Sequence, residues 1–207
     1  MVVEYFFDCS SPWTYLAFSR IKGICEATAA ELVWKPVLVG GVFNAVNQSV
    51  YEQRSNPVPA KARYYQKDLQ DWAGFQNIVI GQPEVFPVNS VKAMRGVFVA
   101  MEEDCVSAYV EAVFRTYWSD LKDISQIDVL TDIVSSVGMN ADEFFAKIND
   151  QDYKDKLKDN TDELIQRGGF GSPTFFIDTT DMYFGNDRLP LIEARLKGWS
   201  GSLSEIA

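Results

Sequence analysis

The chain has 207 residues, enough for one domain or for one domain that carries a sizeable insertion. Its hydrophobic fraction of 47% and charged fraction of 23% are typical of a folded globular protein. The formal net charge of −10 repels phosphate backbones, so we do not expect nucleic-acid binding. Because the sequence has no histidine, Ser-His-Asp triads, Cys-His dyads and histidine-ligated zinc are excluded.

The three cysteines, Cys9, Cys25 and Cys105, lack the C-x-x-C spacing of redox motifs. An odd number cannot pair completely within the chain, which favours a reducing cytosol over a disulfide scaffold. The first residues include the acidic Glu4 and no basic stretch, so we expect no secretory signal peptide. No apolar run is long enough to cross a bilayer. We therefore expect a cytoplasmic protein that does not associate with membranes.

The first elements along the chain follow a β-α-β order. Residues 2–7 are apolar and rich in β-branched and aromatic side chains, which predicts a buried strand. Apolar residues at helical spacing predict a helix over residues 13–25. A second strand is expected over residues 32–39, closed by Gly40 and Gly41. A helix between two strands favours parallel pairing with a right-handed crossover.

The middle of the chain is predominantly helical. From residue 44 to residue 66 the hydrophobic pattern loosens, and Pro57 and Pro59 indicate a loop. Beyond this loop, apolar stripes at helical spacing predict several helices, the last of which ends at Gly168 and Gly169.

Strand patterns return near the C-terminus. Residues 174–178 and 182–184 are separated by a short polar turn, which predicts a hairpin, and a last helix contains the apolar residues from Leu189 to Leu196. The predicted fold class is α/β. One domain is expected from residues 1–43 and 168–207, with an all-helical domain inserted over residues 44–167.

The pair Ser11-Pro12 stands where the first strand leads into the first helix. Serine is a preferred N-cap and proline a preferred first helical residue, so one interpretation is a helix cap and nothing more. A second interpretation uses the same position. The N-terminus of a helix favours a bound thiolate or other anion, to which the Ser11 hydroxyl could donate a hydrogen bond. With no histidine as a base, Ser11 is not expected to be an acyl-transfer nucleophile.

Three other segments contain candidate binding residues. Pro173 enters the predicted third strand, where a cis peptide would leave the backbone of Ser172 free to pair with an extended ligand; an ordinary strand-initiating proline is the alternative. Asn186 and Asp187 open the last helix, which either could cap; alternatively, Asp187 accepts an amino group while nearby N–H groups bind a carboxylate. Lys61 could supply local positive charge for an anionic ligand in this acidic protein. Asn56 could hydrogen-bond a ligand or shape the turn.

These segments together resemble the kappa-class glutathione transferase and 2-hydroxychromene-2-carboxylate isomerase family, a branch of the DsbA-like thioredoxin superfamily. The resemblance covers essentially the whole chain. It is carried by residues 7–16 (FDCSSPWTYL), 58–61 (VPAK), 170–174 (FGSPT) and 184–188 (FGNDR). Ser11 and Thr14 occupy the positions at which redox members carry two cysteines, so disulfide exchange is not expected.

The resemblance implies a thioredoxin-like domain with a helical insertion, a homodimer, and glutathione as the cofactor. It implies that Ser11 assists the glutathione thiolate and that the backbone of Ser172, before a cis-Pro173, pairs with the cysteinyl part. It further implies that Asn186 and Asp187 hold the γ-glutamyl end.

Lys61 is implied to reach the glycyl carboxylate, and Asn56 matches the family pattern less securely. Two residues depart from that pattern: Phe184 replaces a tryptophan, and Ser172 replaces an apolar residue.

The reaction that the resemblance implies is the isomerisation of 2-hydroxychromene-2-carboxylate, an aromatic-degradation intermediate, to trans-o-hydroxybenzylidenepyruvate. Addition of the glutathione thiolate, ring opening, bond rotation and elimination would return glutathione unchanged. A kappa-like transferase or peroxidase, which consumes glutathione, is the alternative enzyme. A non-catalytic ligand-binding module of the same fold is the third interpretation.

Overall fold

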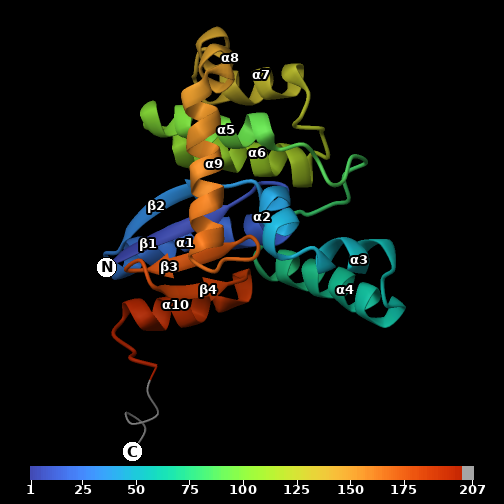
Figure 1. Cartoon of the computed structure of the whole chain (residues 1–207), viewed down its shortest axis with the longest axis vertical. Coiled ribbons are helices and arrows are strands. Elements are labelled where there is room, and N and C mark those ends of the chain that lie inside the picture. Colours follow the sequence, from blue (N-terminus) through green and yellow to red (C-terminus); the bar gives the residue numbers. More distant parts are fainter. Residues whose placement is uncertain (202–207) are drawn as a thin grey trace, which may run out of the picture.

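A computed structural model describes residues 1–201 (Figure 1). Four strands form one mixed sheet in the order β2-β1-β3-β4. β2 is parallel to β1, whereas β3 pairs antiparallel with both β1 and β4. The strands are β1 Val2–Phe7, β2 Glu31–Pro36, β3 Thr174–Ile177 and β4 Asp181–Phe184. The parallel opening and the C-terminal hairpin predicted from the sequence are confirmed.

The second strand is shorter than predicted, because it ends at Pro36 instead of Val39. Its sheet partner β1 ends at Phe7, which pairs with Pro36, so no ladder remains beyond that point. The chain then forms helix α2 (Val39–Val46). Gly40 and Gly41 therefore lie in a helix and do not close a strand.

The strand residues alternate between the two faces of the sheet. Val3, Tyr5 and Phe7 of β1 are fully buried in the larger hydrophobic cluster, together with residues of helix α1 (Pro12–Thr28). Phe6 points to the opposite face, where it packs in a smaller cluster with residues of α2 and α9 (Gln151–Gln166). The sheet is thus covered on both sides.

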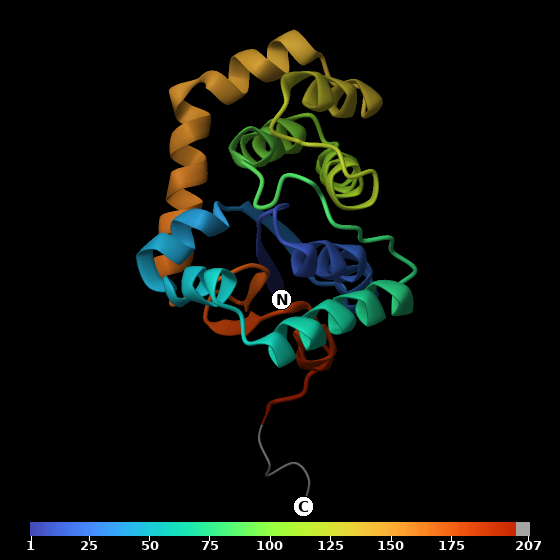
Figure 2. The same ribbon diagram turned by 90° about the vertical axis from the view of Figure 1, so that its right-hand side faces the viewer.

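The predicted helices after residue 90 are present. They are α5 (Val91–Glu102), α6 (Val106–Phe114) with a π-helical extension (Arg115–Ser119), α7 (Ile127–Ser136) and α8 (Ala141–Asn149). These helices form a group beyond the β2 edge of the sheet, and α9 runs from that group back across one face of the sheet (Figures 1 and 2). A short 3-10 turn (Asn186–Arg188) and α10 (Leu189–Leu196) complete the described chain.

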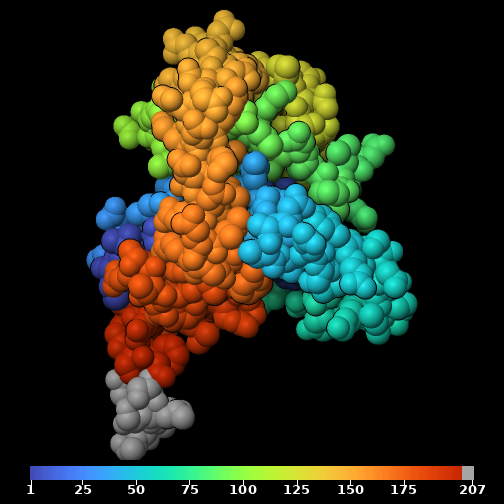
Figure 3. Space-filling view, in the orientation of Figure 1, coloured from blue at the N-terminus to red at the C-terminus, as the bar shows by residue number. Residues whose placement is uncertain are grey.

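The loop predicted between residues 44 and 66 is wrong, because helices α3 (Ser49–Ser55) and α4 (Pro59–Phe75) occupy most of it. Pro59 is the first residue of α4, where its missing N–H costs no hydrogen bond. Of the α4 residues only Ala73 is buried, so the sequence shows no core-facing stripe there. Both helices project from the side of the molecule (Figures 1 and 3).

A cluster of charged side chains joins α9 to the sheet. Arg167, just after α9, pairs with Glu4 of β1 at 2.5 Å and with Glu163 of α9 at 2.6 Å. Lys35 of β2 pairs with Glu163 at 3.0 Å. The Arg167 guanidinium also lies 3.9 Å from the centre of the Phe176 ring in β3. These contacts fix the end of α9 against the sheet.

Candidate functional site

Ser11 occupies the N-cap position of α1, but its side chain makes no capping hydrogen bond. Its hydroxyl lies 3.3 Å from the carbonyl oxygen of Ser172, to which it can donate. The first N–H groups of a helix have no partner within the helix, so α1 presents a partial positive charge beside this hydroxyl. The hydroxyl is not used to cap the helix, and a turn about its side-chain bond would direct it from the Ser172 carbonyl toward a ligand at the helix terminus.

Ser172 lies opposite Ser11, just before β3, and its peptide bond to Pro173 is cis, as the sequence predicts. The Ser172 side chain points into the protein. Its Oγ accepts a hydrogen bond from the N–H of Asp8 at 3.0 Å and lies 2.9 Å from Oγ1 of the buried Thr14. The backbone of Ser172 is thereby held against the start of α1.

Asp8 is a buried acidic residue at the end of β1 that the sequence analysis did not single out. Its carboxylate accepts hydrogen bonds from the N–H groups of Ser10 and Val39, each at 2.9 Å. Burial raises the pKa of this carboxyl group, and these hydrogen bonds oppose the rise. In the sequence, this residue can be recognised only as an acidic residue that directly follows an apolar strand. Asp8 shapes the turn that presents Ser11.

Three cavities meet at residues 10–13. The first, which we call the Ser11 cavity, has a volume of 560 Å³ and is lined by Ser11, Ser172 and residues of α2 and α3. The second, the α4 cavity, has a volume of 690 Å³ and touches Pro12. The third, the Asn186 cavity, has a volume of 290 Å³ and is lined by Trp13 and Ser172. Ser11 therefore lines one cavity directly, and its neighbours Pro12 and Trp13 border the other two.

The Asn186 cavity brings together four residues singled out from the sequence: Ser172, Pro173, Asn186 and Asp187. The Asn186 side chain is buried, and its Nδ2 has no hydrogen-bond partner among residues 1–201. Gly185 precedes it at φ 103°, a conformation that favours glycine, and its N–H donates to the Pro173 carbonyl at 3.0 Å. This cavity thus offers an unpaired amide donor beside the carboxylate of Asp187.

Lys61 and Asn56 are exposed and line none of these three cavities. Asn56 follows α3, and its backbone N–H donates to Glu52. Lys61 lies in the first turn of α4, four and seven residues before Tyr65 and Asp68, which line the Asn186 cavity. This spacing places Lys61 on the same face of the helix, beyond the end of the cavity.

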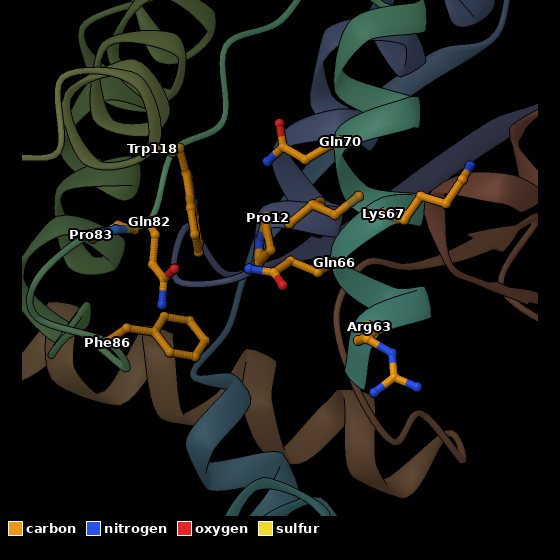
Figure 4. A pocket seen from close by; sticks show the side chains of 11 residues that line it. Pro12, Arg63, Gln66, Lys67, Gln70, Gln82, Pro83, Phe86 and Trp118 are labelled. Carbon is orange, nitrogen blue, oxygen red and sulfur yellow. The ribbon is translucent and has the colours of Figure 1, made fainter. Parts of the chain in front are cut away.

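Glutamines and aromatic rings line the α4 cavity, and sequence patterns gave no sign of this grouping. Gln66 and Gln70 project from α4 toward Gln82, Phe86 and Trp118 on the opposite wall (Figure 4). The Trp118 indole N–H donates to the carbonyl of Cys9 at 2.8 Å, which fixes its ring beside the turn before Ser11. The cavity is therefore suited to a flat ligand.

Residues 1–201 contain no group of three or more His, Cys, Asp and Glu side chains that could hold a metal ion. Within the same range, no helix is both long and apolar enough to cross a membrane. Cys9 lies close to Ser11 in sequence, but it is buried, and burial raises the pKa of its thiol well above the usual range. Burial therefore disfavours the reactive thiolate form of Cys9 in the folded protein.

The fold and the serine-proline turn define a thioredoxin-type domain in which hydroxyl residues replace the redox cysteines. The family described as "DSBA-like thioredoxin domain" matches residues 2–197. The chain therefore belongs to the DSBA-like thioredoxin domain family, and the predicted α/β fold with helical segments is confirmed.

Several relatives are enzymes of known type. A 2-hydroxychromene-2-carboxylate isomerase of Pseudomonas putida is 28% identical over 200 residues, covering 95% of this chain and 94% of the relative. Glutathione S-transferase kappa 2 of Caenorhabditis elegans is 28% identical, covering 92% and 89%. A solved structure of a 2-hydroxychromene-2-carboxylate isomerase superimposes with a TM-score of 0.82 at 25% identity, covering 95% of each chain. The chain is thus related to a group of isomerases and glutathione transferases.

Proposed function

We propose that the protein is a glutathione-dependent isomerase that converts 2-hydroxychromene-2-carboxylate to trans-o-hydroxybenzylidenepyruvate. The observation that carries the proposal is the Ser11 hydroxyl, which makes no capping bond and faces Ser172 at the junction of three cavities. Similarity to isomerases of this reaction over nearly the whole chain supports it.

The residues of the Asn186 cavity fit the γ-glutamyl end of glutathione. That end carries an ammonium and a carboxylate on one carbon. Asp187 can accept from the ammonium, and the unpaired Nδ2 of Asn186 can donate to the carboxylate. The backbone of Ser172 lies between this cavity and Ser11, where the cysteinyl part would lie. Lys61, in the first turn of α4, would meet the glycyl carboxylate of a tripeptide that lies along this helix. We assign Asn56 no more than a supporting contact.

When bound, glutathione supplies a thiolate able to add reversibly to a conjugated double bond. Ser11 would donate a hydrogen bond to the thiolate sulfur, and the partial charge at the α1 N-terminus would lower the thiol's pKa. The cavities on either side of Pro12 would orient the planar substrate against that sulfur. These roles require no proton transfer by Ser11 itself.

The test is turnover of 2-hydroxychromene-2-carboxylate with glutathione measured in the same mixture. The proposal predicts product formation that requires glutathione while the glutathione concentration stays constant. Stoichiometric glutathione loss would instead indicate a transferase or peroxidase, a function that similarity to kappa transferases also supports. If glutathione neither stabilises the protein against heat nor supports turnover, the chain is a non-catalytic member of the family.

We also propose that the protein is cytoplasmic and forms a homodimer. Three large aromatic residues of α4 are more than half exposed and could contribute to a contact between subunits: Tyr64, Tyr65 and Phe75. Analytical ultracentrifugation would show a mass near twice 23.4 kDa if this holds, and the monomer mass if it does not.

A further inference from the structure

Arg54, in the last turn of α3, is held between two aromatic rings. Its guanidinium carbon lies 5.5 Å from the ring centroid of Phe43 and 5.5 Å from that of Phe86. Phe43 belongs to α2 and Phe86 to the segment before α5, so three separate parts of the chain meet at this side chain. Contacts with two rings limit the guanidinium to few orientations.

Arg54 is also the basic residue of the Ser11 cavity. The lining of that cavity includes Ser10, Ser11 and Ser172, and its acidic member Asp8 is buried and bonded to the backbone. Among residues 1–201, Arg54 makes no salt bridge. The net charge of the chain is −10, so an unpaired arginine beside Ser11 locally reverses the sign of the field.

We infer that Arg54 binds the carboxylate of the second substrate and so makes the Ser11 cavity specific for planar carboxylic acids. This inference rests on the proposed function, of which it specifies the substrate recognition. A guanidinium matches a carboxylate with two parallel hydrogen bonds. Phe43 and Phe86 hold the guanidinium and also line the cavity, so they offer flat apolar contacts to the attached ring. A substrate bound in this way shares one cavity with Ser11.

Arg63 of α4 is the nearest competitor for this role. It lines the α4 cavity, and it too makes no salt bridge among the described residues. However, the α4 cavity reaches Pro12 but not Ser11, and no aromatic ring among residues 1–201 lies over the Arg63 guanidinium. Arg63 therefore provides a matched control: an exposed arginine on the neighbouring wall that carries the same charge.

The test measures binding of 2-hydroxycinnamate, a stable planar carboxylic acid, by calorimetry with saturating glutathione present. Arg54→Gln is expected to raise the dissociation constant about 10- to 100-fold, and Arg54→Lys to give an intermediate rise. Arg63→Gln is expected to change it less than about twofold. Because this readout needs no turnover, absence of isomerase activity would contradict the proposed function without affecting the test.

Two further measurements show whether Arg54 binds the carboxylate of the second substrate or a carboxylate of glutathione. The dissociation constant of glutathione alone is expected to be the same in the wild type and Arg54→Gln; a rise for glutathione only would assign Arg54 to the glycyl carboxylate and overturn the inference. The methyl ester of 2-hydroxycinnamate, which has the same ring but no carboxylate, should bind the wild type and Arg54→Gln with the same dissociation constant. No binding of 2-hydroxycinnamate to the wild type, or an equal loss in Arg63→Gln, would also overturn it.

Discussion

The hydroxyl of Ser172 lies 2.9 Å from the hydroxyl of Thr14, in the interior of the protein. Thr14 is in the first turn of α1, and Ser172 directly precedes Pro173 at the entrance to β3. The same Ser172 oxygen accepts the N–H of Asp8, where β1 ends. One side chain therefore connects the strand, the helix and the proline turn that together present Ser11.

Replacing Ser172 with alanine removes this connection. Ser172→Ala leaves the Asp8 N–H and the Thr14 hydroxyl without their partner in a buried region, so the free energy of unfolding should fall by about 1–3 kcal/mol. Urea denaturation measures the change. Ser135→Ala, at an exposed position of α7, is the control and should stay within about 0.5 kcal/mol of the wild type. Equal small effects in both variants would show that the connection adds no stability.

Asp187 is expected to determine the affinity for glutathione. Asp187→Asn keeps the shape of the side chain but removes the charge that would pair with the γ-glutamyl ammonium. The dissociation constant of glutathione should rise about 10- to 100-fold in calorimetry. Asp159→Asn removes one charge from an exposed site on α9 outside the three cavities, and its affinity should match the wild type. A matching rise in both variants would point to net charge instead of a specific contact.

Thiol modification should leave the activity intact. Cys9 and Cys25 are buried and Cys105 is partly exposed. Burial raises the pKa of all three thiols, that of Cys25 to about 11. Iodoacetamide should therefore label the native protein slowly and at Cys105 first, as mass spectrometry can follow. Loss of activity in step with labelling of Cys9 would contradict a role for Ser11 in place of a cysteine.

The charged cluster around Glu163 should make stability depend on pH in the acid range. Burial by itself raises the pKa of Glu163, but hydrogen bonds and charges from Lys35 and Arg167 outweigh it, so the pKa lies below its ordinary value of 4.5. The unfolded chain therefore takes up the proton first. The stabilisation is complete above pH 4.5 and is lost as the pH falls through the lower pKa of the folded state.

Urea denaturation at a series of pH values tests this dependence. The free energy of unfolding should fall below pH 4.5 in the wild type, and the fall should be shallower in Glu163→Gln, which lacks the titrating group. Asp159→Asn, on an exposed turn of the same helix, should follow the wild-type curve. Parallel curves for Glu163→Gln and the wild type would show that the ion pairs do not contribute.

The sequence predicts those helices and strands whose conformation is determined by one local pattern of residues. The apolar run of β1 identifies a strand that is buried on both faces, and the apolar spacing of α1 identifies a helix that buries one face against the core. Helix α4 was missed, because it is exposed on nearly all sides and its proline looks like a loop signal. The end of β2 could not be predicted from its own residues, because β2 ends where its partner β1 ends.

Some residues of the candidate site can likewise be predicted from local sequence patterns, and others cannot. Ser11, Pro173 and Asn186 lie in short motifs at element boundaries, where the backbone leaves few choices of residue. Arg54 belongs to no motif, and its position beside Ser11 arises only when α2, α3 and the segment near Phe86 pack together. Contacts between distant segments of this kind leave no local pattern in the sequence.

The hydrogen bond from Ser11 to a bound thiolate is the central claim, and the pKa of the glutathione thiol in the complex tests it most directly. Ultraviolet absorbance of the thiolate can be titrated with pH in the wild type and in Ser11→Ala. A free thiol has a pKa of about 8.5, and a helix N-terminus with a hydroxyl donor is expected to lower it to about 7.5 or below. Ser11→Ala should move it back toward the free value. A bound thiol with the pKa of free glutathione, or the same lowered pKa in both proteins, would contradict the assignment of Ser11.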